Sequence, residues 1–157
     1  MRGLKYIELV NSVTHELPPL PIAELGPPVL TDLRRPLAAS RLMLIASAGV
    51  HRKSEPPFEP VNDLSFREIS STVEIDELRL SHPTPARLPG EQDLNVVFPY
   101  QRLAELVNEG FIGGVTPYHL SCLGTIKRLT TLVADLSMRM VESGRRAGAH
   151  AVLLVPL

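Results

Sequence analysis

Leu42-Met43-Leu44-Ile45-Ala46 is an unbroken apolar run that ends just before Ala48 and Gly49. A β-strand that is covered on both faces has this composition, because neither of its faces needs polar side chains. We therefore predict that the run is the first core strand of an α/β domain. Residues 51–58 are polar and contain two prolines, so we expect a loop at the carboxyl end of this strand.

The remaining pattern predicts further short strands and two helices. Strands are expected at residues 66–69, 78–80, 111–115 and 149–157, and the last of these is apolar enough to be buried. Helices are expected from Pro99 to Gly110 and from Ile126 to Ser143. Residues 83–90 contain three prolines and should form a long irregular loop near the strand ends. The sequence thus predicts a three-layer α/β fold with a mostly parallel sheet of four or five short strands, similar to half of a flavodoxin-like or Rossmann-like domain.

The first forty residues differ from the rest of the chain. Prolines cluster at residues 17–21 and 26–28, which disfavours regular structure and predicts an extended arm over residues 1–40. Before these prolines, Tyr6, Leu9, Val10 and Val13 recur at helical spacing, so a short helix is expected to dock on the body or on a second subunit. We assign residues 41–157 to the α/β domain, and we expect this domain to be incomplete at its C-terminus.

Composition excludes several classes of function. The chain has 157 residues, of which 44% are hydrophobic and 21% are charged, and its formal net charge is −1. This balance gives no reason to expect nucleic acid or an anionic membrane surface as a partner. The longest apolar stretch, residues 42–50, is shorter than the roughly 20 residues that a membrane span needs, and no signal-peptide core is visible. We expect a cytoplasmic protein.

Three histidines are candidates for a binding site. His51 follows the first core strand and would face the crevice at the strand ends, where α/β proteins usually bind ligands. A binding or proton-transfer role and a solvated loop histidine both remain open for it. His82 and His119 also fall in or next to loops that could converge on this crevice. The spacing of about thirty residues matches no short metal-ligand motif, so we favour a site without metal.

Other chemically interesting residues have simpler explanations. Asp93 and Asn95 precede the first predicted helix and can cap it or bend the loop. Cys122 is the one cysteine, which excludes an internal disulfide, and we expect it to be buried and inert. The glycines at positions 110, 113, 114 and 124 form no phosphate-binding motif, and no cofactor is predicted.

A series of short motifs runs through residues 37–157. In chain order they are Ser47-Ala48-Gly49-Val50-His51, Phe66-Arg67-Glu68-Ile69, Leu80-Ser81-His82, Gln92-Asp93-Leu94-Asn95-Val96-Val97-Phe98-Pro99, Ile112-Gly113, His119, Ser121, Gly124 and Ala151-Val152-Leu153-Leu154-Val155-Pro156. Together they resemble the selenoprotein B family of glycine, sarcosine, betaine and D-proline reductases, particularly its short D-proline reductase-like members. The run from Gln92 to Pro99 is the most specific of these motifs.

The resemblance implies a particular chemistry. In this family the strand that ends like Leu154-Val155-Pro156 is followed at once by a selenocysteine or cysteine that opens a helix, which holds the selenol or thiol as an anion. Such a residue cleaves a bond to carbon in glycine, betaine, sarcosine, D-proline or a similar small molecule. We therefore expect that Leu157 precedes a selenocysteine codon that was read as a stop. The chain as given would then be inactive and hold no catalytic residue of its own.

The resemblance also suggests which residues shape the site. They are His51, His82, Asp93, Asn95 and His119, which would contact the small-molecule substrate or a second reductase subunit. An uncovered strand edge would favour association, so a homo-oligomer is expected. The alternative is a non-catalytic interaction subunit that pairs with another chain through its open strand edge and its proline-rich arm.

Overall fold

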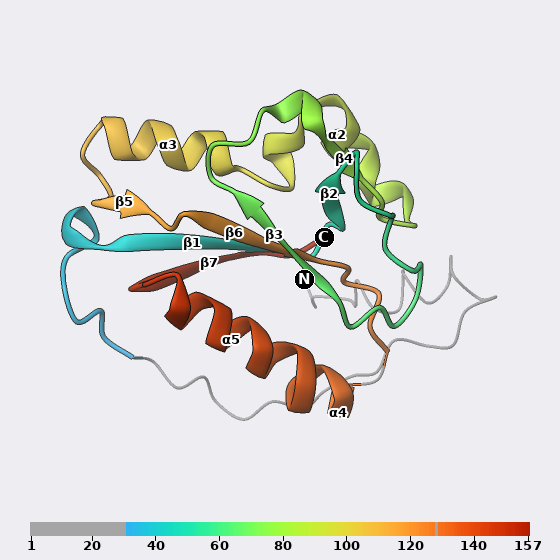
Figure 1. The fold of residues 1–157 in the computed structure, drawn as a ribbon. Coiled ribbons are helices and arrows are strands. Elements are labelled where there is room, and N and C mark those ends of the chain that lie inside the picture. Colours follow the sequence, from blue (N-terminus) through green and yellow to red (C-terminus); the bar gives the residue numbers. More distant parts are fainter. Residues whose placement is uncertain (1–30, 128) are drawn as a thin grey trace, which may run out of the picture. The chain divides into compact units, whose positions relative to one another are not determined.

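The apolar run at residues 42–46 forms the central strand of a mixed sheet, as predicted (Figure 1). The structure is a computed structural model that describes residues 31–127 and 129–157. The predicted N-terminal helix and most of the arm therefore lie outside the described residues. The strands of the sheet are β1 (Arg41–Ala46), β3 (Phe66–Ser70), β5 (Gly114–Val115), β6 (Tyr118–Cys122) and β7 (Ala151–Val155).

The sheet is mostly parallel. Strand β1 pairs in parallel with β5 and β6 on one side and with β7 on the other, whereas β3 runs antiparallel to β6. Ile45 is paired with Leu120 of β6 and with Leu154 of β7. A second, two-stranded antiparallel sheet is formed by β2 (Val50–Arg52) and β4 (Leu78–Leu80).

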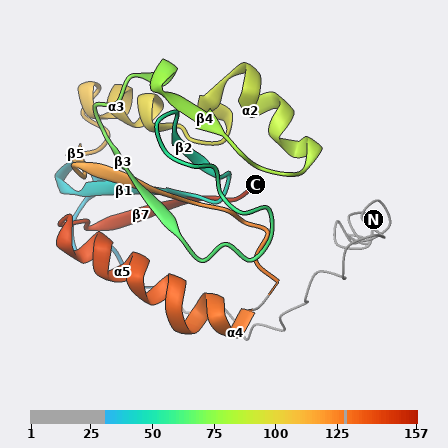
Figure 2. The same ribbon diagram turned by 45° about the vertical axis from the view of Figure 1, so that its right-hand side comes forward.

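Helices cover both faces of the main sheet. Figures 1 and 2 show α3 on one face and α4 with α5 on the other. The α-helices are α2 (Leu88–Gln92), α3 (Tyr100–Asn108), α4 (Leu129–Thr131) and α5 (Ser137–Arg146), and a π-helical turn, Leu132–Leu136, joins the last two. Short 3₁₀ turns occur at Leu37–Ala39, Ile75–Glu77, Pro85–Arg87 and Leu94–Val96.

Two hydrophobic cores lie on opposite faces of the sheet. Successive side chains of a strand point to opposite faces, so β1 contributes to both cores. Leu44 packs with Phe98 and Leu103 on the α3 side, whereas Met43 packs with Met140 on the α5 side. The predicted three-layer α/β architecture is therefore confirmed.

Several predicted boundaries are wrong. Residues 83–90 are not irregular, because Pro85 and Pro89 occupy the first turns of two short helical segments, where a missing backbone N–H costs nothing. Strands β2 and β6 were not predicted, and His51 lies in β2 and not in a loop. Ile126 is buried but precedes the last helical segments, which continue to Arg146. The helix after Pro99 is confirmed, with Gly110 at a positive φ of 77° just after it.

The final strand exists, but it is not buried. Strand β7 is paired only with β1 among the described strands, and its central side chains are exposed. An apolar run cannot distinguish a covered strand from an edge strand, because the pattern does not reveal what lies beside it. No helix within the described residues has the length and hydrophobicity needed to cross a membrane.

Candidate functional site

The carboxyl ends of three neighbouring strands meet at Ser47, Gly124 and Leu157. The backbone N–H of Gly124 donates to the carbonyl oxygen of Ser47 at 2.8 Å, and the N–H of Leu157 donates to the Ser47 hydroxyl at 2.9 Å. A Cβ atom on Gly124 would lie 3.1 Å from the Ser47 hydroxyl oxygen and 3.3 Å from the Leu157 carbonyl oxygen. Glycine therefore allows these ends to approach closely, at the edge of the sheet where α/β proteins bind ligands.

The chain leaves β1 through a turn that needs glycine. Gly49 has a φ of 73°, and a Cβ atom there would lie 2.8 Å from the Leu123 side chain. The same position is bordered by the Phe58 ring and the backbone of His82, each 3.6 Å away. This turn therefore brings the β2–β4 pair and its histidines to the carboxyl end of β1.

His51 and Ser81 form a hydrogen-bonded pair on these two strands. The Nδ1 atom of His51 lies 2.8 Å from the carbonyl oxygen of Arg52, which can only accept, so Nδ1 carries the proton. The Nε2 atom forms a hydrogen bond with the Ser81 hydroxyl at 2.6 Å. The His51 ring is buried and meets Phe58 edge to face. This geometry orients a serine towards an imidazole, with a backbone carbonyl in the position where a catalytic triad has a carboxylate.

His82 directly follows this pair and is also buried, with 5% of its surface exposed. Its Nδ1 atom accepts from the backbone N–H of Thr84, which places the ring proton on Nε2. Nε2 is buried and has no hydrogen-bond partner among the described residues. Burial, together with the nearby charge of Arg87, lowers the pKa of His82, so the ring is neutral near pH 7. The Nε2–H group is thus an unused donor close to the strand ends.

Asp93 and Asn95 have local structural roles. A side-chain oxygen of Asp93 accepts from the backbone N–H of Asn95 at 2.9 Å and from its side-chain amide at 3.1 Å. The backbone hydrogen bond from Asn95 lowers the pKa of Asp93. The Asn95 amide also donates to Gln101 of α3 at 2.8 Å. Asp93 therefore caps the 3₁₀ turn Leu94–Val96, whereas α3 follows Pro99 without a side-chain cap.

His119 lies inside the sheet, so the expectation of a loop position is wrong. The pairing of β1 with β5 ends at Leu42 and its pairing with β6 begins at Ile45, and between them the backbone N–H of Leu44 donates to Nδ1 of His119 at 3.2 Å. The imidazole thus replaces a missing backbone acceptor. Burial lowers the pKa of His119 to about 4, so it is neutral at physiological pH. Its ring packs edge to face on Phe98.

The single cysteine is not activated. Burial, and then the charge of Asp63, raise the pKa of the Cys122 thiol to about 11, so the thiol is protonated near pH 7. Within residues 31–127 and 129–157, no group of histidine, cysteine and acidic side chains could hold a metal ion. The described side chains at the strand ends can bind and orient polar groups.

The structure brings only part of the predicted site together. His51 contacts Ser81, which His82 follows in the chain, whereas Asp93 caps the 3₁₀ turn that contains Asn95, and His119 lies in strand β6. Sequence reasoning did not select Ser47 or Ser81 as site residues. A small polar residue directly after a core strand is the signal that could have identified Ser47.

Comparison with known proteins gives one informative match. No family model matches the chain, and no solved structure matches it. The D-proline reductase subunit gamma of Acetoanaerobium sticklandii is 27% identical over 128 residues, which are 82% of this chain and 53% of the relative. This chain is similar to a D-proline reductase subunit. It spans about half the length of that relative, and the likeness supports a relationship with D-proline reductase-like proteins.

Proposed function

We propose that this chain is part of a reductase subunit that cleaves a bond to carbon in D-proline or a similar small molecule, such as glycine, betaine or sarcosine. The observation that carries the proposal is the similarity to the D-proline reductase subunit gamma over 82% of the chain. The three converging strand ends at Ser47, Gly124 and Leu157 supply a suitable place for the reaction.

The reacting group would be a selenol or thiol directly after Leu157. The hydrogen bond from Leu157 to Ser47 fixes the backbone at this point, so the next residue would start at the carboxyl end of the sheet. If a helix begins there, its unpaired N–H groups and its dipole would lower the pKa of the selenol or thiol. The anion is the form that attacks carbon.

The overall reaction needs an external reductant. Cleavage of one bond to carbon adds two electrons and two protons: one proton goes to the carbon and the other to the leaving group. A dithiol can supply both through a selenium–sulfur or disulfide bond that is then reduced. Cys122 does not fit this role, because its thiol is protonated and half-buried.

His82 and the His51–Ser81 pair would contribute to binding. His82 would contribute where a polar group of a substrate or a partner subunit reached its Nε2 atom, which is buried and has no hydrogen-bond partner among the described residues. A second reductase subunit that carries a reactive carbonyl would then supply the remaining part of the site.

One observation favours a second function, a non-catalytic interaction subunit. Among the described strands only β1 pairs with β7, and Leu154 is 68% exposed. Exposed apolar edge strands pair readily with other chains. A chain that used this edge for assembly alone would need no reacting residue after Leu157.

Activity distinguishes these proposals. The reading frame is expressed through and beyond codon 157, with cysteine or selenocysteine in the next position, and is co-expressed with the other subunits of a D-proline reductase. We expect consumption of one of the four substrates that depends on dithiothreitol, and none with the chain that ends at Leu157. A matched variant with serine after Leu157 should be inactive while it still assembles. Equal activity of the serine variant, or no activity with any substrate, would contradict the proposed reaction.

A further inference from the structure

Ser81 has the surroundings of a serine nucleophile. Its hydroxyl lies 2.6 Å from Nε2 of His51, and Nδ1 of the same ring lies 2.8 Å from the carbonyl oxygen of Arg52. A nucleophile within hydrogen-bond distance of a base, which a third group orients in turn, is the arrangement that activates serine for attack on a carbonyl carbon. The proposed reduction uses neither Ser81 nor His51 as a reactant.

The pairing of β2 with β4 positions the two residues. His51 is paired directly with Arg79, so Ser81, two residues further on, lies diagonally across from His51 on the same face. His51 is 5% exposed, and its edge-to-face contact with Phe58 holds the ring in one orientation. Ser81 is half-buried and directly follows β4, so a small molecule can reach it. The base is thus shielded, whereas the nucleophile is accessible.

A backbone donor for an oxyanion lies next to the nucleophile. Attack on a carbonyl group develops negative charge on its oxygen, which a positioned N–H group stabilises. In the α/β-hydrolases, the backbone N–H of the residue directly after the nucleophile has this role. Here that residue is His82, and its backbone N–H has no acceptor among residues 31–127 and 129–157. This N–H group is therefore free to bind a substrate oxygen.

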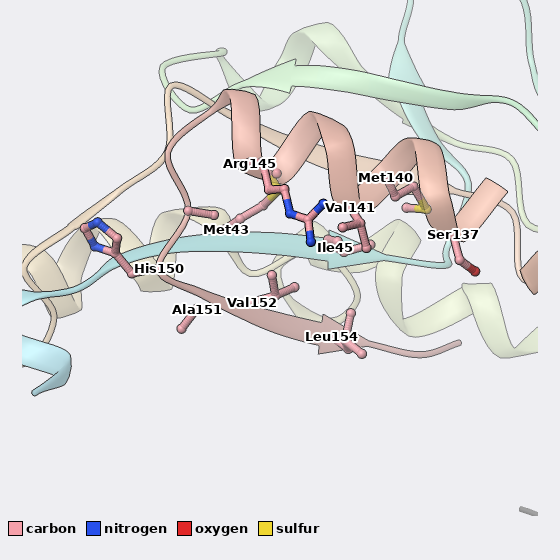
Figure 3. A pocket seen from close by; sticks show the side chains of 12 residues that line it. Met43, Ile45, Ser137, Met140, Val141, Arg145, His150, Ala151, Val152 and Leu154 are labelled. Carbon is pink, nitrogen blue, oxygen red and sulfur yellow. The ribbon is translucent and has the colours of Figure 1, made fainter. Parts of the chain in front are cut away.

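Another serine and histidine line one groove without forming such a pair. The groove lies between α5 and β7, has a volume of about 420 Å³ and is lined mainly by apolar side chains. Figure 3 shows Ser137 and His150 at its opposite ends. The Ser137 hydroxyl donates to the carbonyl oxygen of Leu132, and Nδ1 of His150 accepts from the backbone N–H of Arg41. Ser137 is half-buried like Ser81, so it is a matched serine without a base.

We propose that Ser81 is the nucleophile and His51 the general base of an esterase site that hydrolyses small acyl esters. The Oγ atom of Ser81 bonds to the ester carbonyl carbon while its proton passes to Nε2 of His51. The bond from that carbon to the alcohol oxygen then breaks, and the proton passes from His51 to the alcohol. Water hydrolyses the acyl-serine by the same route, so ester and water give acid and alcohol without an oxidant or reductant.

The surroundings of Ser81 favour small substrates. Because Ser81 is half-buried, a short acyl group reaches its hydroxyl more readily than a large one. The inference is independent of the proposed function, because ester hydrolysis needs no selenol or thiol and uses only groups that the structure describes.

Two probes test this proposal on the folded protein. A fluorophosphonate should add once, at Ser81, with loss of fluoride, and concentrated urea should abolish the reaction because activation depends on the contact with His51. p-Nitrophenyl acetate should release p-nitrophenol and leave an acetyl group on Ser81 as the intermediate. Mass spectrometry of the intact protein and of its peptides measures both adducts.

Substitutions assign the roles of the two residues. Ser81→Ala should remove the adduct, and His51→Gln should slow its formation about 100-fold or more, which is the usual contribution of a general base. Ser137→Ala is the matched control and should react like the original protein. Thermal denaturation shows which variants are folded during the assay. If neither Ser81→Ala nor His51→Gln folds, Ser81→Cys still tests the site, because its thiol beside His51 should react with iodoacetamide far faster than Cys122.

Several results would overturn the proposal. They are the absence of an adduct on the folded original protein, an adduct on a residue other than Ser81, and equal rates of labelling for the original protein and His51→Gln. Alkylation of the new thiol in Ser81→Cys no faster than that of Cys122 would also contradict it. None of these results bears on the proposed reductase activity, which is measured with other substrates.

Discussion

The backbone N–H of Leu157 donates to the hydroxyl of Ser47 at 2.9 Å, which ties the end of β7 to the end of β1. Because Gly124 also donates to the Ser47 carbonyl, one residue holds the ends of three parallel strands together. Each strand end then has a fixed position relative to the others, and any residue after Leu157 starts from a defined point. Ser47 is therefore a positioning residue for the proposed reacting group.

Replacement of Ser47 by alanine tests this role. The variant should lower the free energy of unfolding by about 0.5–1.5 kcal/mol, which is the usual net value of one hydrogen bond. It should also speed amide exchange at Leu157. Ser71→Ala is a matched control, because the Ser71 hydroxyl donates to the Pro117 carbonyl away from this site. Urea denaturation and hydrogen exchange measure both effects, and equal exchange at Leu157 in the two variants would contradict the positioning role.

Stability should depend on pH through His119. Its folded-state pKa of about 4 lies below the ordinary value of 6.5, so between these values the unfolded chain binds a proton that the folded chain does not. Stability from the neutral ring is therefore complete above pH 6.5 and falls as the pH decreases to about 4, by up to about 3 kcal/mol. His82 contributes in the same direction, because its pKa is also lowered.

A substitution isolates the contribution of His119. His119→Gln does not titrate, and its amide oxygen can still accept from the backbone N–H of Leu44. The variant should be less stable than the original protein at pH 7, and its stability should fall less between pH 6.5 and pH 4. Denaturation curves at several pH values measure the difference, and parallel pH profiles for the two proteins would exclude His119 as the titrating group.

We expect that the Ser81 hydroxyl is needed as the hydrogen-bond partner of the His51 Nε2 atom. In Ser81→Ala the Nε2 atom of buried His51 loses its hydrogen-bond partner, which should lower the free energy of unfolding by about 1–3 kcal/mol. Ser81→Thr retains a hydroxyl and should recover most of this loss. Chemical denaturation of the two variants provides the comparison. If both substitutions cost the same, the loss would come from packing and not from the hydrogen bond to His51.

Cys122 should be unreactive in the folded protein. With a pKa of about 11, less than about one thiol in a hundred is ionised at pH 8, so alkylation by iodoacetamide should be slow until the protein unfolds. Cys122→Ala should therefore leave the proposed reductase activity unchanged in a protein that continues past Leu157. Mass spectrometry after timed alkylation measures the rate, and rapid labelling of the folded protein would show that the thiol is activated.

The sequence predicts those parts of the fold that are determined by local pattern. The apolar run of β1 and the Pro99 to Gly110 signals of α3 correspond directly to structure, because strand burial and helix capping depend on neighbouring residues. Strand β6 was not predicted, because its alternation is broken by a buried histidine whose partner, Leu44, lies 75 positions away. The exposure of β7 was also not predictable, since it depends on what lies beside the strand.

In the candidate site, too, the sequence predicts single residues but not the contacts that depend on the topology of the sheet. The position of His51 after the first strand was visible in the sequence, but its hydrogen bond to Ser81 depends on the pairing of β2 with β4. Ser47 contacts both Gly124 and Leu157. Gly124 lies more than 70 positions after Ser47 in the chain, and Leu157 lies 110 positions after it. Contacts of this kind follow from the topology of the sheet and not from any local motif.

The account depends on a reacting residue directly after Leu157, and a single peptide tests it. Trypsin cleaves after Arg146, so the protein isolated from the cells that produce it should yield a peptide that begins at Ala147 and contains β7. After reduction and alkylation, mass spectrometry should show that this peptide continues past Leu157 with an alkylated selenocysteine or cysteine as its next residue. A peptide that ends at Leu157, or one that continues with any other residue, would contradict the proposed reaction.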